Sequence, residues 1–225
     1  MTKPGRLTLD TAVRLGTVAG IPVAMRVSFL FGAAFLAAPL WLRGTWATTI
    51  LGCALIGCLV GSIVVHELAH AGAARAFGIA CRGIELHALG GFAVLDRMPR
   101  GTGGRVAILL AGPLANLALY GFFATLAEGS PAVAASRAVA LARDVNFGLF
   151  AFNLLPCFPL DGGRALHALL VRWVARRHAD RAVGMLGLAV AGYCVLVAIP
   201  YPTLLFVAVY LGLASLAVLR EGWVE

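Results

Sequence analysis

The feature that most constrains this chain is a run from Thr45 to Ala74 that is almost entirely apolar and contains one formally charged residue, Glu67. About 20 consecutive apolar residues are enough for a helix to cross roughly 30 Å of hydrocarbon. A helix is also the conformation that pairs its own backbone groups where no water is present. The run therefore predicts a membrane-spanning helix, and the rest of the chain must fold around it.

The composition agrees with a chain that crosses the membrane several times. Hydrophobic residues make up 61% of the sequence, charged residues only 12%, and the mean hydropathy is +0.92. Soluble domains are about half apolar and a quarter charged. Apolar stretches predict spans at residues 27–42, 47–69, 105–127, 138–158, 182–199 and 201–219. We therefore expect an all-α polytopic membrane protein with about six transmembrane helices, forming one membrane-embedded domain over residues 1–225.

Basic residues alternate between the segments that connect these spans. Residues 1–26, 70–105 and 159–181 are rich in Lys and Arg, whereas the intervening connections carry few. The positive-inside rule then places both termini in the cytoplasm, with residues 1–26 as an interfacial or short β-type lead-in and 159–181 as a basic cytoplasmic segment. The first span, 27–42, is expected to stay uncleaved. The net charge of +8 comes without a nucleic-acid-binding motif, so we expect a lipid bilayer and no nucleic acid as partner.

Residues 79–97 are too polar and too rich in glycine to form a span. Apolar and polar residues alternate over residues 84–87, and Gly90-Gly91 can turn before a second apolar stretch. This pattern predicts a short β-hairpin-like segment near the cytoplasmic face. Asn116, in the third predicted span, is expected to form a hydrogen bond between helices.

Three ionisable residues stand together in the second predicted span. His66 and His70 are four residues apart, so on a helix both imidazoles point in nearly the same direction and can share a metal ion. Glu67 borders the same face. The order His-Glu-x-x-His is typical of two zinc ligands and a carboxylate that accepts a proton from water. The alternative is a hydrogen-bonded His–Glu cluster that packs helices.

A catalytic zinc ion usually has three protein ligands, so a third is expected elsewhere in the chain. Asp161 is the candidate, because the second and fourth predicted spans run in the same direction and place all three groups toward the cytoplasmic end. Glu85, His87, His167 and His178 are weaker alternatives. Asp161 itself could instead be a helix cap or a turn residue. The five cysteines are odd in number and lack a Cys-x-x-Cys pair, so we expect no disulfide framework.

Two motifs together resemble the site-2 protease family of intramembrane zinc metalloproteases. They are His-Glu-Leu-Ala-His at 66–70 and Asn-Leu-Leu-Pro-Cys-Phe-Pro-Leu-Asp-Gly-Gly at 153–163. Shorter agreements occur at 20–23, 90–92 and 111–116, in the family's order. The chain resembles the minimal six-span type, without a PDZ domain.

This resemblance implies a zinc endopeptidase that cuts a single-span membrane protein in or near its transmembrane segment, as in regulated intramembrane proteolysis. It implies one Zn²⁺ per chain on His66, His70 and Asp161, and Glu67 as general base. Asn153 would help to bind the substrate or the developing oxyanion. The implied location is a bacterial or archaeal cell membrane.

The substrate is expected to be a helix that unwinds before its backbone can be attacked. Residues 82–95, with Gly90, Gly91 and Phe92 at their centre, would offer a strand edge for the unwound peptide. Two other classes of function are weighed against this one. A transporter or metal-handling protein would spread polar groups through several helices across the membrane, and an inactive relative that binds membrane proteins would not need all four principal residues.

Overall fold

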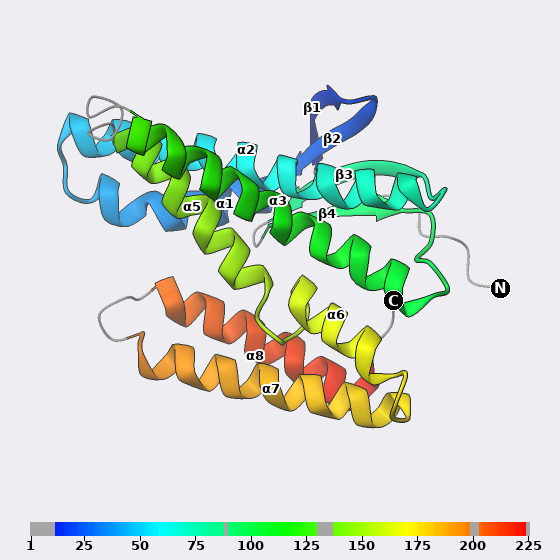
Figure 1. Cartoon of the computed structure of the whole chain (residues 1–225). Helices are drawn as coiled ribbons and strands as arrows, with labels where there is room; N and C mark the ends of the chain where they lie inside the picture. Colours follow the sequence, from blue (N-terminus) through cyan, green and yellow to red (C-terminus); the bar gives the residue numbers. More distant parts are fainter. Residues whose placement is uncertain (1–11, 88–89, 130–136, 199–202, 224–225) are drawn as a thin grey trace. The chain divides into compact units, whose positions relative to one another are not determined.

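The computed structural model describes residues 12–87, 90–129, 137–198 and 203–223 (Figure 1). The chain divides into two compact units, Met1–Arg97 and Met98–Glu225. The first unit contains β1 (Ala12–Val18), β2 (Ile21–Arg26), α1 (Val27–Trp41), α2 (Trp46–Ala76), β3 (Cys81–His87) and β4 (Gly90–Leu95). The second contains α3 (Thr102–Gly129), α5 (Arg137–Asn153), α6 (Asp161–Leu170), α7 (Arg176–Leu196) and α8 (Thr203–Glu221).

The long helix α2 is the centre of the first unit. Its N-terminus is capped by Thr45, whose hydroxyl accepts a hydrogen bond of 3.3 Å from the backbone N–H of Thr48. The helix then runs for 31 residues, well past the 47–69 expected from hydropathy. Because the helix continues to Ala76, His66 and His70 lie within regular helix rather than at its end.

The four strands form one sheet in the order β1-β2-β3-β4. Ala19 and Gly20, with φ of 51° and 78°, connect β1 to β2, and these two positive φ values are those of the type I′ turn that suits a two-residue hairpin. Strands β2 and β3 are parallel, which requires a crossover connection, and α1 and α2 provide it. The β-type lead-in and the predicted hairpin thus belong to a single sheet, so the expectation of an all-α fold with an isolated hairpin was incomplete.

The predicted turn at Gly90-Gly91 is wrong. Both glycines are paired within the antiparallel β3–β4 ladder, Gly90 opposite His87 and Gly91 opposite Leu86. Residues 88–89, which connect the two strands, lie outside the described residues. The hairpin itself is confirmed.

One face of the sheet packs on α2. Ile84 and Leu86 are completely buried in β3, and β3 and β4 both contact α2. A Cβ atom at Gly91 would lie 3.0 Å from Cγ2 of Ile63, so the glycine allows β4 to approach the helix closely.

The second unit pairs its long helices. Helix α3 lies beside α5, and the Asn116 amide donates a 2.9 Å hydrogen bond to Oδ1 of the buried Asn146 across this contact. The expected interhelical hydrogen bond of Asn116 is confirmed. Helices α7 and α8 run side by side (Figure 1), with Gly184 and Gly187 against Leu219 and Ser215.

Helix α6 was not predicted, because it falls in the segment expected to be a basic connection. It begins at Asp161, directly after an irregular stretch that contains Pro156 and Pro159. A Cβ atom at Gly162 would lie 2.3 Å from the Leu154 carbonyl oxygen, and one at Gly163 would lie 2.3 Å from the carbonyl carbon and oxygen of Cys157. The two glycines therefore let the first turn of α6 lie directly against the backbone that precedes it.

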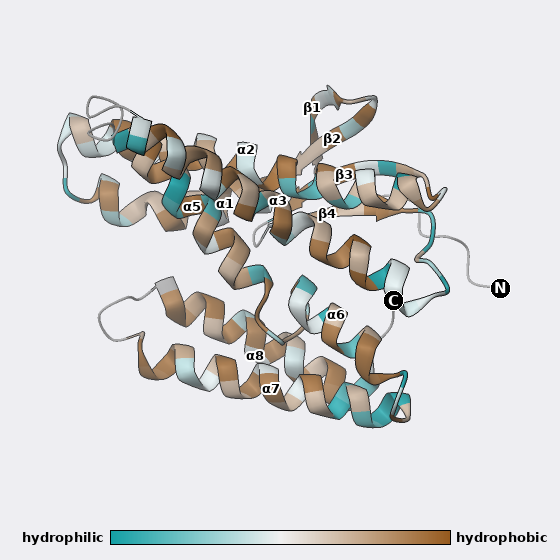
Figure 2. Cartoon of the chain, viewed as in Figure 1, coloured by the Kyte–Doolittle hydropathy of each residue, from teal (hydrophilic) through white to brown (hydrophobic). Residues whose placement is uncertain are grey.

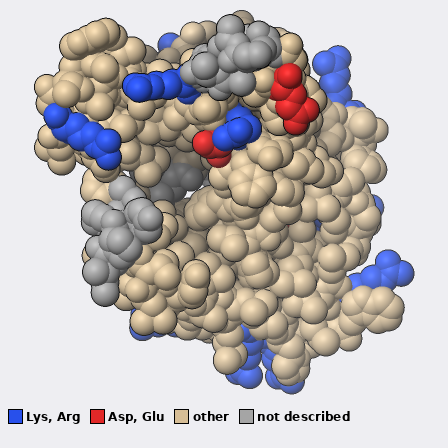
Figure 3. All heavy atoms as spheres, turned by 60° about the vertical axis from the view of Figure 1, so that its left-hand side comes forward, with Lys and Arg blue, Asp and Glu red and all other residues tan. Residues whose placement is uncertain are grey.

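The structure is that of a mostly helical membrane protein. Four described helices are long and apolar enough to cross a bilayer, namely α2, α3, α7 and α8 over Leu204–Glu221, and α1 is a shorter apolar helix. Hydrophobic residues dominate these helices, while polar residues gather at the start of α7 (Figure 2). Many large apolar side chains are exposed, Phe31 and Leu196 among them, and uncharged residues cover most of the face in Figure 3.

The close approach at Gly163 gives a test of this architecture. Gly163→Ala should lower the stability of the purified protein by about 1–3 kcal/mol, because the added methyl group meets backbone atoms that cannot move aside cheaply. The matched control is Gly148→Ala, at an exposed site in α5 where a Cβ atom meets nothing within 4 Å. Thermal unfolding in detergent measures both, and equal midpoints for the two variants would contradict the role of Gly163.

Candidate metal centre

His66 and His70 form a buried pair on one face of α2. Their side chains are about 5–7% exposed, and the two Nε2 atoms lie 3.1 Å apart. Two nitrogen ligands about 2.05 Å from a tetrahedral ion would be about 3.3 Å apart. The ring planes are nearly perpendicular, at 81°, with both Nε2 atoms turned toward each other. The pair therefore has the donor atoms and the spacing that a zinc ion needs.

Glu67 is buried beside this pair, at 4% exposure, and faces β4. A Cβ atom at Gly91 would lie 2.9 Å from Cγ and 3.0 Å from Oε1 of Glu67. The Glu67 side chain thus lies directly against the strand backbone, and a side chain at position 91 would force it to shift. This contact brings an acid–base group and a strand of the sheet to the same place within the first unit.

Asp161 is the first helical residue of α6 and is 6% exposed. A carboxylate in the first turn of a helix is stabilised by the exposed N–H groups and the helix dipole. Arg164, one turn later, has its Nη1 atom 3.7 Å from Oδ1 of Asp161. Asp161 therefore lies inside the first turn and not at the cap position, which Leu160 occupies.

Among the described residues, His66, His70 and Asp161 make up the group of His, Cys, Asp or Glu side chains that could hold a metal ion. Each offers one ligand atom, and all three are buried. Two imidazole nitrogens and one carboxylate oxygen are a donor set suited to catalytic zinc, which leaves a fourth position open.

The other candidates for a third ligand have different partners. Glu85 is buried and bound by Arg26, whose Nε and Nη2 atoms lie 2.9 and 2.8 Å from Oε2. His167 is hydrogen-bonded to Asp180 over 2.8 Å, and His178 is exposed. Burial, followed by the nearby Arg26, lowers the pKa of His87, while Glu85 opposes this effect. None of these four belongs to the candidate metal group.

Asn153 is the last residue of α5 and is half-buried. Its Nδ2 atom donates a 2.9 Å hydrogen bond to the carbonyl oxygen of Leu149 in the same helix. An amide nitrogen has two N–H donors, so this bond occupies one of them.

Strand β4 begins with Gly90, Gly91 and Phe92. In the described part of the chain β4 pairs with β3 alone, so it is an edge strand of the sheet. Phe92 is 39% exposed and opposite Glu85, and its ring lies 5.7 Å from that of His87. Phe92 therefore points away from α2, on the face of the sheet opposite Gly91.

Two contacts that involve buried ionisable side chains were missed by sequence reasoning. The Arg26–Glu85 pair joins residues 59 apart, and the His167–Asp180 pair joins two different helices. No local spacing rule identifies such pairs, because their members are distant in sequence or lie in different helices.

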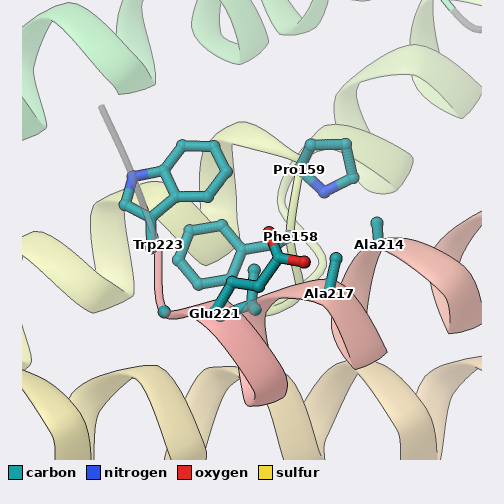
Figure 4. A pocket seen from close by; sticks show the side chains of 8 residues that line it. Phe158, Pro159, Ala214, Ala217, Glu221 and Trp223 are labelled. Carbon is teal, nitrogen blue, oxygen red and sulfur yellow. The ribbon is translucent and has the colours of Figure 1, made fainter.

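A pocket of about 280 Å³ lies in the second unit, between the irregular stretch before α6 and the C-terminal end of α8 (Figure 4). Its lining is mainly apolar and includes Phe158, Ala217 and Trp223, with the exposed Glu221 at its side. No candidate metal ligand lines it.

Comparison with known proteins bears directly on these groups. The model of peptidase family M50 matches residues 54–140 and 126–199, which include both histidines, Glu67 and Asp161. The zinc metalloprotease MJ0392 of Methanocaldococcus jannaschii is 31% identical over 169 residues, covering 72% of this chain and 46% of that protein. The Rip3 protein of Mycobacterium tuberculosis is 36% identical over 202 residues, covering 80% of this chain and 48% of that protein. The chain thus spans about half the length of these relatives.

A solved structure has a similar fold. The site-2 protease from Methanocaldococcus jannaschii matches with a TM-score of 0.72 and 24% identity, covering 95% of this chain and 96% of that one. The match of the family model over more than half of the residues carries the assignment, and the relatives agree with it. The chain belongs to peptidase family M50, the site-2 protease family.

Proposed function

We propose that this chain is an intramembrane zinc endopeptidase that hydrolyses a peptide bond in or near the transmembrane segment of a single-span membrane protein. The observation that carries the proposal is the buried His66–His70 pair with Glu67 beside it, in a helix long and apolar enough to cross a bilayer. Family membership supports the same chemistry. The chain acts as one membrane-embedded catalytic domain of six spans, with both termini in the cytoplasm.

In this proposal a single Zn²⁺ ion is held by His66, His70 and Asp161. The donor set and the burial of the three support it. When bound, the ion supplies the Lewis acidity that makes a water molecule nucleophilic near neutral pH. Metal binding also accounts for two imidazoles buried in an apolar helix, where polar groups without partners are costly.

Glu67 performs the proton transfers. Its carboxylate accepts a proton from the attacking water and later returns it to the nitrogen of the leaving amine. Burial beside Gly91 keeps bulk water away from this group. The Asn153 amide has a second N–H besides the one that is bonded to Leu149. This N–H would donate a hydrogen bond to the oxyanion.

The free edge of β4 positions the substrate. An unwound peptide that paired with this edge would lie about 4.8 Å from β4. Because Gly91 touches Glu67, the peptide backbone would pass beside the general base. Gly90 and Gly91 have no side chains, so the substrate backbone could approach the strand closely there. Phe92 would contact substrate side chains on the outer face of the sheet. Residues that weaken helices near the cut would ease the unwinding, so substrates should carry them.

Glu67→Gln tests the chemistry. The variant should lose at least about 100-fold in the rate of cleavage, because the amide cannot accept the proton. It should still bind one zinc ion per chain, since the two histidines and Asp161 are unchanged. Purified protein is analysed for metal and incubated with a panel of single-span membrane proteins in detergent.

The matched control for this experiment is Glu128→Gln, which changes an exposed carboxylate near the end of α3 and should cleave like the wild type. Unchanged cleavage by Glu67→Gln would overturn the base role. Absence of bound zinc in the wild type and in both variants would overturn the metalloprotease assignment and favour a silent or transporting relative.

Phe92→Ala tests the substrate edge. Gly91→Val is less suitable, because the new side chain would also displace Glu67 and Ile63. Truncating Phe92 removes an exposed ring from the outer face and should raise KM for a transmembrane substrate by about tenfold, a hot-spot effect of about 1.4 kcal/mol. Zinc content and kcat should change little.

Phe31→Ala is the matched control, since it removes an equally large exposed ring that belongs to α1 and not to the sheet. If both phenylalanine variants raise KM equally, the effect belongs to general lipid or detergent contact and the edge of β4 has no special part in binding.

A further inference from the structure

A buried polar pair in the second unit takes no part in the proposed chemistry. Nε2 of His167, in α6, lies 2.8 Å from Oδ1 of Asp180, in α7. The two residues are 4% and 8% exposed. A buried polar pair of this kind is costly if one member is removed, so its position in the fold is informative.

The pair is enclosed by aromatic rings and by the end of the chain. Phe158 is fully buried, with its ring centre 5.5 Å from that of His167 on one side and 4.3 Å from that of Trp223 on the other. The Phe158 and Trp223 rings are nearly parallel, and Figure 4 shows them together beside the pocket. Arg176, one turn before Asp180, donates to the carbonyl oxygen of Trp223.

His167 is the residue of this cluster that lies on α6. The helix has only ten residues, no side chain caps its N-terminus, and helices this short are marginal without tertiary contacts. Its first turn is held against the preceding backbone by Gly162 and Gly163, and its last turn contains His167. Between these two anchors, the orientation of α6 determines where the Asp161 carboxylate points.

The apolar packing of α6 and its hydrogen bond to α7 differ in what they restrict. Packing of Leu166 and Leu170 against the buried cluster around Phe158 favours burial but allows a short helix to slide or rotate. A hydrogen bond of 2.8 Å is directional and fixes the rotation of α6 about its own axis. His167 lies six residues after Asp161, so a rotation at one position displaces the other by the same angle.

We propose that His167 is a positioning residue for Asp161, held in place by its hydrogen bond to Asp180. This inference rests on the proposed function, in which Asp161 is a zinc ligand. The pair acts through the rigid helix α6 and touches neither the metal nor the substrate. Breaking it leaves the ligand set intact but lets the carboxylate depart from the geometry that zinc requires.

The experiment measures zinc affinity of the detergent-solubilised full chain by titration against a competing chelator. His167→Ala and Asp180→Leu should each weaken zinc binding by about tenfold, the lower end of the effect of residues that orient metal ligands. Asp180→Leu breaks the same hydrogen bond from α7, so the test stands even if His167→Ala does not fold.

Conservative variants separate the hydrogen bond from packing. His167→Gln keeps a donor at nearly the position of Nε2, and Asp180→Asn keeps an acceptor oxygen, so both should stay within about threefold of the wild type. Leu169→Ala is the matched control on α6, because this side chain is 45% exposed and its truncation should leave zinc affinity unchanged.

A double-mutant cycle shows whether the effect passes through Asp161. In an Asp161→Asn background, His167→Ala should weaken zinc binding by less than about twofold, because the group that it orients is already gone. An undiminished tenfold effect in that background would overturn the proposal. So would His167→Ala and Asp180→Leu proteins that melt earlier without zinc yet bind it with wild-type affinity.

The proposed function fails separately. If Asp161→Asn alone binds zinc as tightly as the wild type, Asp161 is not a ligand and both proposals fall together. If Asp161→Asn weakens binding and His167→Ala does not, the ligand set stands and only the positioning role is rejected.

Discussion

The arrangement of this protein depends on how α2 holds two imidazoles and a carboxylate inside an apolar helix. Groups of this kind are costly in hydrocarbon unless each has a partner. The helix places the two imidazole nitrogens 3.1 Å apart and turns the carboxylate toward a strand of the sheet. A zinc ion bound by both rings, as proposed, would satisfy their nitrogen atoms and give the buried cluster a chemical use.

A second consequence of the membrane environment concerns the small sheet. Hydrolysis of a transmembrane helix requires an extended peptide, and an extended peptide has unpaired backbone groups that lipid cannot satisfy. Strand β4 offers a free edge within reach of Glu67, and Gly91 is the residue that permits the approach. Under the proposed function the sheet and the helix are complementary, since the sheet would satisfy the substrate backbone and the helix would provide the carboxylate that transfers protons.

Much of this could be predicted from local spacing. Hydropathy located every long helix that the structure describes, and the four-residue separation of His66 and His70 placed both rings on one face. Local spacing did not find α6, because a ten-residue helix with two glycines in its first turn has too weak a propensity to stand out. It also misplaced the hairpin turn, since glycines that serve a close approach look the same in sequence as glycines that turn.

The sequence by itself determined that the chain is a membrane protein, that α2 carries a metal-binding pattern, and that a hairpin follows it. These features depend on composition and on short periodic spacings, which a helix or strand converts directly into geometry. Only the tertiary structure decided that β1 and β2 join the hairpin in one sheet, that Gly91 faces Glu67, and that His167 pairs with Asp180. These contacts join residues distant in sequence, and their energies depend on burial and direction, which no local pattern encodes.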